Sequence, residues 1–206
     1  MAFDNVITAV MIEIKQKLTD FCKSLDESSP LSPELSVSFS SGLKTSLAAG
    51  GVAGLRTFLE AFDNTADKLE IGDDTFYRKP PSSKNFLTPF GIMELSRNVF
   101  QTNRGGKTFI PLDRKWGMVN QFATTDVRDV ILFGSSDLSP RVAGTFFKKA
   151  SLFHPSHTAI ENIINETGEF LHENGAEILE QVRNNEGLPE GTLGYRCHSN
   201  LFFYLQ

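Results

Sequence analysis

The sequence predicts an α+β fold, in which N-terminal helices precede a small β-hairpin region and a C-terminal region of further helices. Apolar residues recur at helical spacing near both ends of the chain, whereas the middle holds short apolar runs separated by turns that contain Gly and Pro. The 18 phenylalanines among 206 residues favour packed cores over disorder. We divide the chain into residues 1–66, 67–118, 119–186 and 187–206.

The first region, residues 1–66, is predicted to be helical. Residues 5–25 carry an apolar seam with alternating steps of four and three. The seam is short, so its partner can be either another helix of the same chain or the same helix of a second copy. The Ser/Pro-rich residues 26–41 predict a linker. A second helix is expected over residues 43–62, with a break or kink at Gly50-Gly51, since each Gly weakens a helix by about 1 kcal/mol relative to Ala. The seam consists of Ile7, Met11, Ile14, Leu18, Phe21 and Leu25.

The second region, residues 67–118, is predicted to form β-hairpins, because five short runs have strand-like composition and turn signals separate them. The tetrapeptide 104–107, Arg-Gly-Gly-Lys, is interpreted as a hairpin turn with two basic residues at its tip. It lacks the spacing and the following helix of a phosphate-binding loop. The expected strands are 69–71, 75–78, 85–89, 93–100 and 108–111, with turns at 72–73, 80–82, 90–91 and 104–106.

The third region, residues 119–186, returns to helical periodicity. Thr124 or Thr125 is a candidate N-cap for a first helix. Ser139-Pro140 predicts the start of a second, since Ser often caps a helix and Pro often occupies its first position. Ser156 is expected to cap a third helix that continues to about residue 184. Residues 187–206 begin as a loop and end in an aromatic run, and we treat them as an aberrant tail.

The composition is that of an ordinary globular chain, with 40% hydrophobic and 22% charged residues. The two cysteines, Cys22 and Cys197, form no CxxC pair and imply no disulfide framework, so a reducing, cytoplasmic setting is expected. The N-terminal sequence lacks a basic segment followed by an uninterrupted apolar run. We therefore expect no signal peptide and no membrane contact.

The charge is unevenly distributed along the chain. Residues 1–76 carry a net charge of −6, residues 77–115 of +6 and residues 116–206 of −5. A basic block is the sequence signature of a phosphate-binding surface, because contacts to phosphates dominate nucleic-acid affinity. The alternative is a solvated hairpin face with no ligand. The candidate phosphate contacts in this block are Arg78, Lys79, Lys84, Arg97, Arg104 and Lys107.

Residues 125–171 are predicted to form a helix-turn-helix-like unit. In such a unit a supporting helix, here 139–150, holds a second helix, here 156–171, in the DNA major groove. The expected turn, residues 151–155, is longer than usual and the second helix is not basic, so an ordinary helical bundle is the alternative. Candidate phosphate contacts on the supporting helix are Arg141, Lys148 and Lys149. Candidate base contacts are His157, Thr158, Asn162 and Asn165, since Asn pairs with adenine through two hydrogen bonds.

Metal binding and hydrolytic catalysis find little support in the sequence. His154 and His157 supply two ligands where zinc needs three or four, and Cys197-His198 would have to complete the set. We therefore expect no metal site. The motifs of serine hydrolases, zinc proteases and Cys/His nucleophile pairs are absent from the sequence, so no catalytic residue is assigned.

The segment from Phe76 to Leu171, about half of the chain, resembles bacterial DDE-type transposases of the ISKra-like and ISLre-like insertion sequences. Each motif is weakly specific, but the motifs occur in the family's order. The matching residues are Arg78-Lys79, Thr88-Pro89-Phe90-Gly91, Arg97-Asn98-Val99-Phe100, Gly105-Gly106-Lys107, Pro111-Leu112-Asp113, Trp116-Gly117-Met118 and Ser139-Pro140-Arg141.

The resemblance implies a DNA-binding and assembly role in DNA transposition, with transposon ends as the partner and a homo-oligomer as a further expectation. In the family, an Asp-bearing catalytic strand that holds Mg²⁺ follows a phrase like Leu188-Pro189-Glu190-Gly191. No acid follows Glu190 here, so we expect this chain to be truncated, without cofactor and catalytically incomplete. The alternative function is a helical homo-oligomerisation or protein-interaction module that does not bind DNA.

Overall fold

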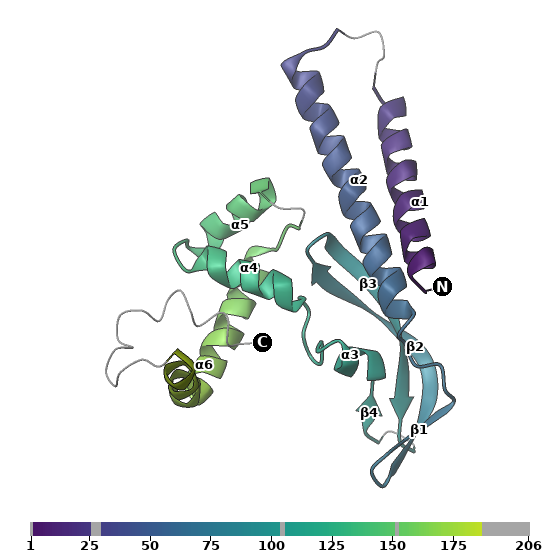
Figure 1. Ribbon diagram of the computed structural model, residues 1–206, viewed down its shortest axis with the longest axis vertical. Helices are drawn as coiled ribbons and strands as arrows, with labels where there is room; N and C mark the ends of the chain where they lie inside the picture. The colour runs from purple at the N-terminus through teal and green to yellow at the C-terminus, as the bar shows by residue number, and fades with distance from the viewer. Residues whose placement is uncertain (1, 26–29, 104–105, 151–152, 187–206) are drawn as a thin grey trace. The chain divides into compact units, whose positions relative to one another are not determined.

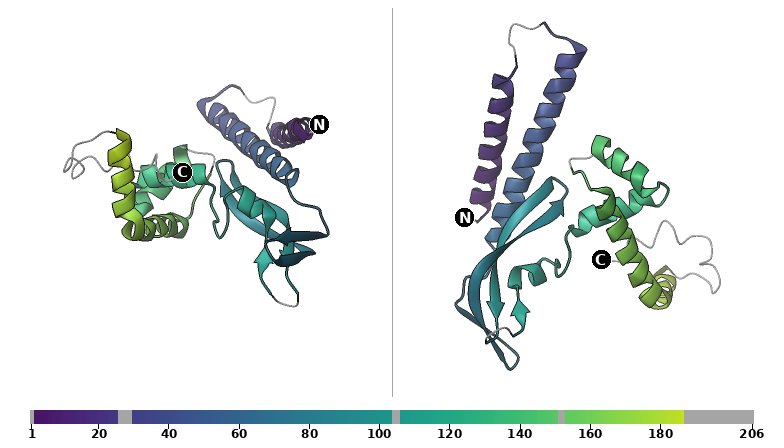
Figure 2. Two further views of the ribbon diagram at one scale, coloured as in Figure 1. Left: turned by 60° about the horizontal axis from the view of Figure 1, so that its bottom comes forward. Right: turned by 180° about the vertical axis from the view of Figure 1, so that it is seen from behind.

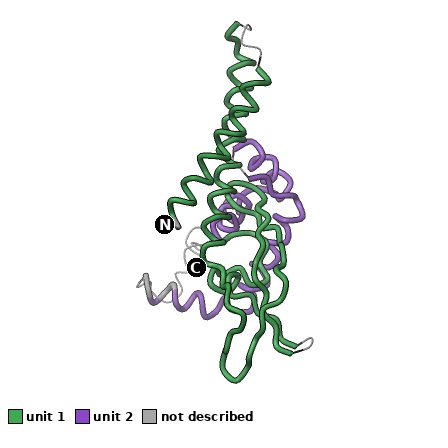
Figure 3. Tube along the Cα trace, turned by 90° about the vertical axis from the view of Figure 1, so that its right-hand side faces the viewer, with its two compact units in different colours: residues 1–124 green, residues 125–206 purple. Residues whose placement is uncertain are grey.

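The computed structural model describes residues 2–25, 30–103, 106–150 and 153–186. These residues form two compact units, 1–124 and 125–206, which are coloured separately in Figure 3. The first unit contains three helices and a four-stranded antiparallel sheet, and the second contains three helices. The α+β class predicted from the sequence is therefore confirmed. The tail expected at residues 187–206 lies outside the described residues.

The first unit begins with two long helices, α1 (Ala2–Lys23) and α2 (Pro33–Glu60), which pack along each other (Figures 1 and 2). Small residues of α2 allow the close approach. A Cβ added at Gly42, Gly50 or Gly54 would overlap a side chain of α1, and Ser46 is buried in the same row. The four residues follow one another at steps of four, which places them on one face of the helix. Large residues of α1 fill the space that they leave.

Two expectations about α2 are corrected. Residues 33–41 belong to the helix rather than to a linker, and the helix continues through Gly50-Gly51 without a break. Its early start has a local cause. The Ser32 hydroxyl accepts a hydrogen bond from the Leu35 amide at 3.2 Å, and Pro33 occupies the first helical position. The pair of glycines is tolerated because packing against α1 outweighs their low helix propensity.

The predicted seam of α1 is only partly buried. Ile14 and Phe21 lie at the glycines of α2, as do Val6 and Val10, which were not assigned to the seam. Ile7 and Met11, in contrast, are 62% and 63% exposed. The inward face is thus rotated from the heptad seam, because the small residues of α2 accept the β-branched side chains of α1.

The sheet has the strand order β1-β2-β3-β4 (Figure 1), built from β1 (Lys68–Ile71), β2 (Asp74–Thr88), β3 (Gly91–Gln101) and β4 (Thr108–Phe109). The turn expected at Pro80-Pro81-Ser82 is wrong, since β2 runs through these residues with a bulge between Lys79 and Ser82. Proline is tolerated there because β1 pairs only with residues 74–77, which leaves that edge of β2 without a β1 partner.

The β2–β3 turn rests on the second helix. Gly91 has a φ of +120°, and the Thr88 hydroxyl donates to the Gly91 carbonyl at 2.7 Å. A Cβ added at Gly51 would overlap the Phe90 ring, so the turn approaches α2 closely at a glycine. The core below it joins α2, the sheet and the short helix α3 (Pro111–Lys115), and residues 1–66 therefore share one core with residues 67–118. Its buried members are Leu59, Phe86, Met93, Leu95, Leu112 and Met118.

The second unit contains α4 (Thr125–Ser135), α5 (Pro140–Ala150) and α6 (His157–Glu186), close to the three helices predicted. The Ser156 hydroxyl accepts from the Ala159 amide at 3.1 Å, so the predicted cap of α6 is confirmed. The Phe147 ring lies so close to Gly134 that a Cβ there would meet it, and it stacks on Phe153 at 5.6 Å between ring centroids. Ile131, Ala143, Ile160 and Ile163 complete this buried centre.

We expect Gly50→Val to lower the free energy of unfolding by about 1–3 kcal/mol, because the added methyl groups would have to displace Ile14. Gly168→Ala is the matched control. Gly168 lies inside α6 with nothing within 4 Å of an added Cβ, so this change should raise stability by about 0.5–1 kcal/mol. Urea unfolding followed by circular dichroism measures both. Equal effects of the two substitutions would show that α2 does not pack on α1 through its glycines.

Candidate nucleic-acid interface

The second unit presents two adjoining helices whose buried and exposed faces are clearly separated. Ala143 and Phe147 of α5 and Ile160 and Ile163 of α6 are buried. The side chain of Arg128 in α4 donates to Glu166 of α6 at 2.7 Å, which ties the first helix to the third. Three helices held in this way fix the exposed faces of α5 and α6 relative to each other.

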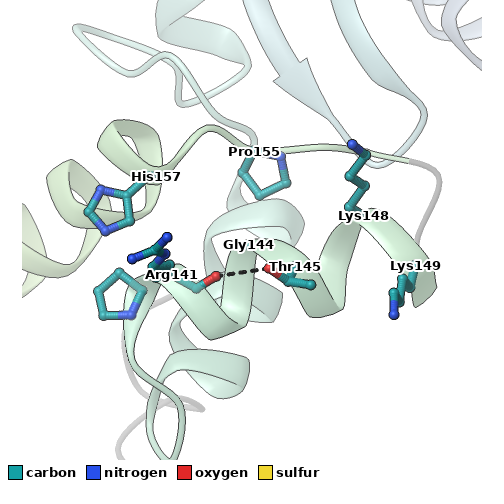
Figure 4. A pocket seen from close by; sticks show the side chains of 8 residues that line it. Arg141, Gly144, Thr145, Lys148, Lys149, Pro155 and His157 are labelled. Atoms are coloured by element: carbon teal, nitrogen blue, oxygen red, sulfur yellow. Dashed lines mark hydrogen bonds between the residues drawn. The ribbon is translucent and has the colours of Figure 1, made fainter.

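An open groove of about 880 Å³ lies where α5 meets the start of α6 (Figure 4). Arg141, Lys148 and Lys149 are exposed and line it together with His157, and no carboxylate lines it. Helix α5 itself contains no Asp or Glu. The three predicted phosphate contacts of the supporting helix are thus gathered on one surface. Such a surface can bind an anion that spans several cations, as a nucleic-acid backbone does.

Sequence reasoning missed the neutral residues of this groove. Pro140, Gly144, Thr145 and Pro155 also line it. Thr145 follows Arg141 by four residues and precedes Lys148 by three, so helical periodicity alone could have placed it on the same face. Its hydroxyl donates to the Arg141 carbonyl at 3.2 Å (Figure 4). Gly144 lies close to α6, since a Cβ added there would contact the buried Ile160 side chain at 3.5 Å.

The predicted base contacts lie on the exposed side of α6. Thr158, Asn162 and Asn165 follow at steps of four and three and are all exposed, so they form one row along the first turns of the helix. His157 is exposed and lies 3.3 Å from Glu161 between its Nδ1 and a carboxylate oxygen, which is an ion pair only when the histidine is protonated. The row offers a hydroxyl and two amides, groups that can bond to base edges.

The basic block of the first unit is locally neutralised. Arg78 donates to Asp67 at 2.7 Å and to the Thr65 carbonyl at 2.9 Å. Lys107 lies 2.7 Å from Asp74, and this hydrogen bond and the charge of Asp74 raise the pKa of Lys107. The antiparallel sheet therefore brings the acidic residues that precede the block beside its cations, and a phosphate at either position would have to replace an existing partner.

The other basic residues of the block differ in their surroundings. Lys84 is half-buried, donates to the Gln121 carbonyl at 2.7 Å and lies over the Phe86 ring at 5.0 Å. Lys79 is exposed beside the bulge of β2. Arg104, predicted at the tip of a hairpin turn, lies outside the described residues. The block is thus not one continuous basic surface over the described residues.

Arg97 was predicted to contact phosphate, and this prediction is wrong. Its side chain is 4% exposed and forms an ion pair with Asp113, whose side chain is 9% exposed. The Phe86 ring lies 5.4 Å from the guanidinium carbon. The sequence signal for this ion pair was the lone carboxylate of Asp113, which follows the apolar Leu112. A buried charge is paired in most folded proteins, so Asp113 was a candidate partner for Arg97.

The remaining candidates form no metal site in the described part of the chain. His154 and His157 lack a third ligand there, since residues 2–186, apart from the undescribed gaps, contain no cluster of three or more His, Cys, Asp or Glu. Cys197 and His198 lie outside the described residues. Nor does any helix in the described ranges combine the length and apolar character that spanning a membrane requires.

Comparisons with known proteins give no relative for this chain. No protein-family model, no curated protein and no solved structure matches it.

We expect Arg97→Ala to lower the free energy of unfolding by about 3–5 kcal/mol, because it leaves the Asp113 carboxylate buried without its partner. Lys68→Ala serves as the control. It breaks an exposed ion pair with Glu70 on the same sheet and should leave the stability almost unchanged, because solvent screens this pair. Chemical denaturation of the purified chain compares the two. A cost for Arg97→Ala as small as that of the control would contradict the buried pair.

Proposed function

We propose that this chain is the DNA-binding and assembly portion of a DDE-type insertion-sequence transposase, and that the unit formed by residues 125–206 makes the contacts to the transposon ends. One observation carries the proposal. The cations of α5 and the row of hydroxyl and amide groups on α6 are exposed on adjoining helices that a common core holds together.

The two helices are suited to different tasks. The cations of α5 would bind phosphates of the duplex, a contact that fixes position and orientation but reads no sequence. The row formed by Thr158, Asn162 and Asn165 would enter the major groove. There the side-chain amide of an Asn can donate a hydrogen bond to adenine N7 and accept one from the adenine N6 amino group. Glu161 beside this row repels phosphates. Its charge favours a pose in which α6 faces bases and α5 faces the backbone.

The first unit has a structural role in this proposal. Four of the motifs that carry the transposase resemblance contribute residues to its turn and its core, namely Thr88 and Gly91, Arg97, Leu112-Asp113 and Met118. The proposal therefore gives DNA binding to the second unit and assembly to the first.

A second candidate function, an interaction module without DNA binding, is favoured by the apolar side chains that α1 leaves exposed. The two candidates predict opposite results with DNA, since binding that is driven by phosphate contacts must weaken as salt concentration rises.

We expect Arg141→Glu and Lys148→Glu to weaken binding to every duplex alike and to lower the slope of log affinity against log salt by about one unit for each lost phosphate contact. Asn162→Ala should cost about 1–3 kcal/mol on the terminal sequence of the encoding element and little on scrambled DNA. Fluorescence anisotropy with both duplexes at two salt concentrations measures these effects.

Lys23→Glu is the matched control, because it reverses one exposed charge at the end of α1 and should leave the salt slope unchanged. Lys107→Glu should have a smaller effect than Lys148→Glu, since Lys107 is already paired with Asp74. If the unaltered chain binds neither duplex at low salt, DNA binding is excluded and the interaction module takes its place.

A further inference from the structure

Helices α4 and α5 carry exposed aromatic rings on the side that faces away from α6. Phe146 of α5 and Phe133 of α4 are 52% and 74% exposed. Gly144 faces α6, and Phe146 lies two residues further, about 160° around the helix from that contact. Arg128 bonds to α6, and Phe133 lies five residues further, about 140° around α4. Both rings are therefore directed away from α6, on one side of the helix pair.

The ring of Phe146 is held in position and lies beside a cation. It packs on the buried Phe147 ring at 5.7 Å between centroids, with 66° between the two planes. Lys149 follows Phe146 by three residues and Val142 precedes it by four, so these side chains share one flank of α5. Lys149 also lines the groove between α5 and α6, together with Arg141. The apolar flank and the basic groove are therefore neighbouring strips of one surface.

A basic strip beside an exposed aromatic ring is suited to a DNA strand whose bases are unpaired. Proteins hold such strands by binding the phosphates with cations and by stacking the bases on aromatic side chains. The charges of the two helices also orient the strand. Helix α5 contains no Asp or Glu, whereas Asp129 of α4 precedes Phe133 by four residues. The backbone of the strand is therefore expected over α5, with the bases directed toward Phe133.

The cations decide between this ligand and the apolar surface of another protein. The centres of protein–protein interfaces are depleted of charged residues, and of Lys in particular. Here Lys149 shares its flank with the exposed Phe146 and Val142, and its own helix offers it no carboxylate. A nucleotide of an unpaired strand is an anion with a flat apolar face, so it matches both parts of this flank.

We propose, on the basis of the DNA binding proposed above, that the second unit binds a duplex continued by an unpaired strand. Phe146 and Val142 receive the first unpaired bases, and Lys149 binds a phosphate between them. The exposed row of α6 contacts paired bases in the major groove. The flank of α5 adds a contact that blunt-ended DNA cannot make, because the faces of paired bases are covered by their neighbours in the stack.

Fluorescence anisotropy of the full-length chain with labelled probes tests this preference. The probes are a blunt duplex of the terminal sequence of the encoding element, the same duplex with about six unpaired thymidines on its 5′ or its 3′ end, and an oligothymidine. We expect one of the two extended duplexes to bind at least about fivefold more tightly than the blunt duplex, which is the effect of one stacked base.

Substitutions at Phe146 assign the gain to stacking. Phe146→Leu should remove most of the gain and leave binding to the blunt duplex unchanged, because leucine keeps an apolar contact with Phe147 but has no ring. Phe146→Trp should keep the gain, and the fluorescence of the new indole should fall when the extended duplex binds, since a base then stacks on it. Thermal unfolding should give both variants a melting temperature near that of the parent, because half of the Phe146 side chain is exposed.

Phe170→Leu is the matched control. Phe170 is 47% exposed on the same unit, but Glu166 and Glu173 lie four residues before it and three after it on α6, so phosphates are repelled there. This variant should bind every probe as the parent does.

The probes separate failure of this proposal from failure of DNA binding as such. Equal affinity for the blunt and both extended duplexes overturns the unpaired-strand site and leaves duplex binding intact. A gain that Phe146→Leu does not reduce, or that Phe170→Leu reduces equally, also overturns it. Binding to oligothymidine that depends on Phe146, without binding to any blunt duplex, supports the site on α5 and excludes the duplex contacts of α6. If the chain binds none of the probes at low salt, both proposals are overturned.

Discussion

The buried ion pair between Arg97 and Asp113 constrains the core of the first unit. It joins the middle of β3 to α3, and it lies beside Phe86 in a core that also receives Leu59 from α2. A charge in such a place is tolerated only with its partner, since taking either ion out of water costs several kcal/mol. The Arg97 Nε and one Asp113 oxygen find no hydrogen-bond partner among the described residues, so the pair itself is the main compensation. Any rearrangement that separates β3 from α3 would leave both charges without their partner and would therefore destabilise the fold.

The distribution of charge has a different meaning in each unit. In the first unit the antiparallel strands set acidic residues against the basic block, as with Lys107 and Asp74. In the second unit the cations of α5 have no acidic residue on their own helix and gather around one groove. The few cations of α5 are therefore better candidates for binding phosphates than the more numerous basic residues of the first unit. The attraction for a phosphate depends on the positive charge that nearby carboxylates leave uncompensated.

Packing along α1 and α2 follows from side-chain size. Small residues of α2 at steps of four form a row into which β-branched residues of α1 fit, and Gly51 does the same for Phe90 of the β2–β3 turn. The helix thus uses glycine on two sides, where the local cost in helix propensity is offset by close contact. The same arrangement turns Ile7 and Met11 outward and leaves α1 with an exposed apolar face.

The sequence by itself determined the fold class, the start of α5 at Ser139-Pro140, the cap of α6 at Ser156 and the exposure of the Asn162 row, because caps and periodicity depend on residues within a few positions. Only the tertiary structure decided which charges pair and which apolar face is covered. Arg97 and Arg141 look alike in the sequence, yet one is buried against Asp113 and the other lines an open groove. Ile7 and Ile14 belong to one heptad seam, yet only Ile14 meets a glycine of α2. Both distinctions depend on residues far away in the chain, and local patterns carry no information about which distant side chain will arrive beside them.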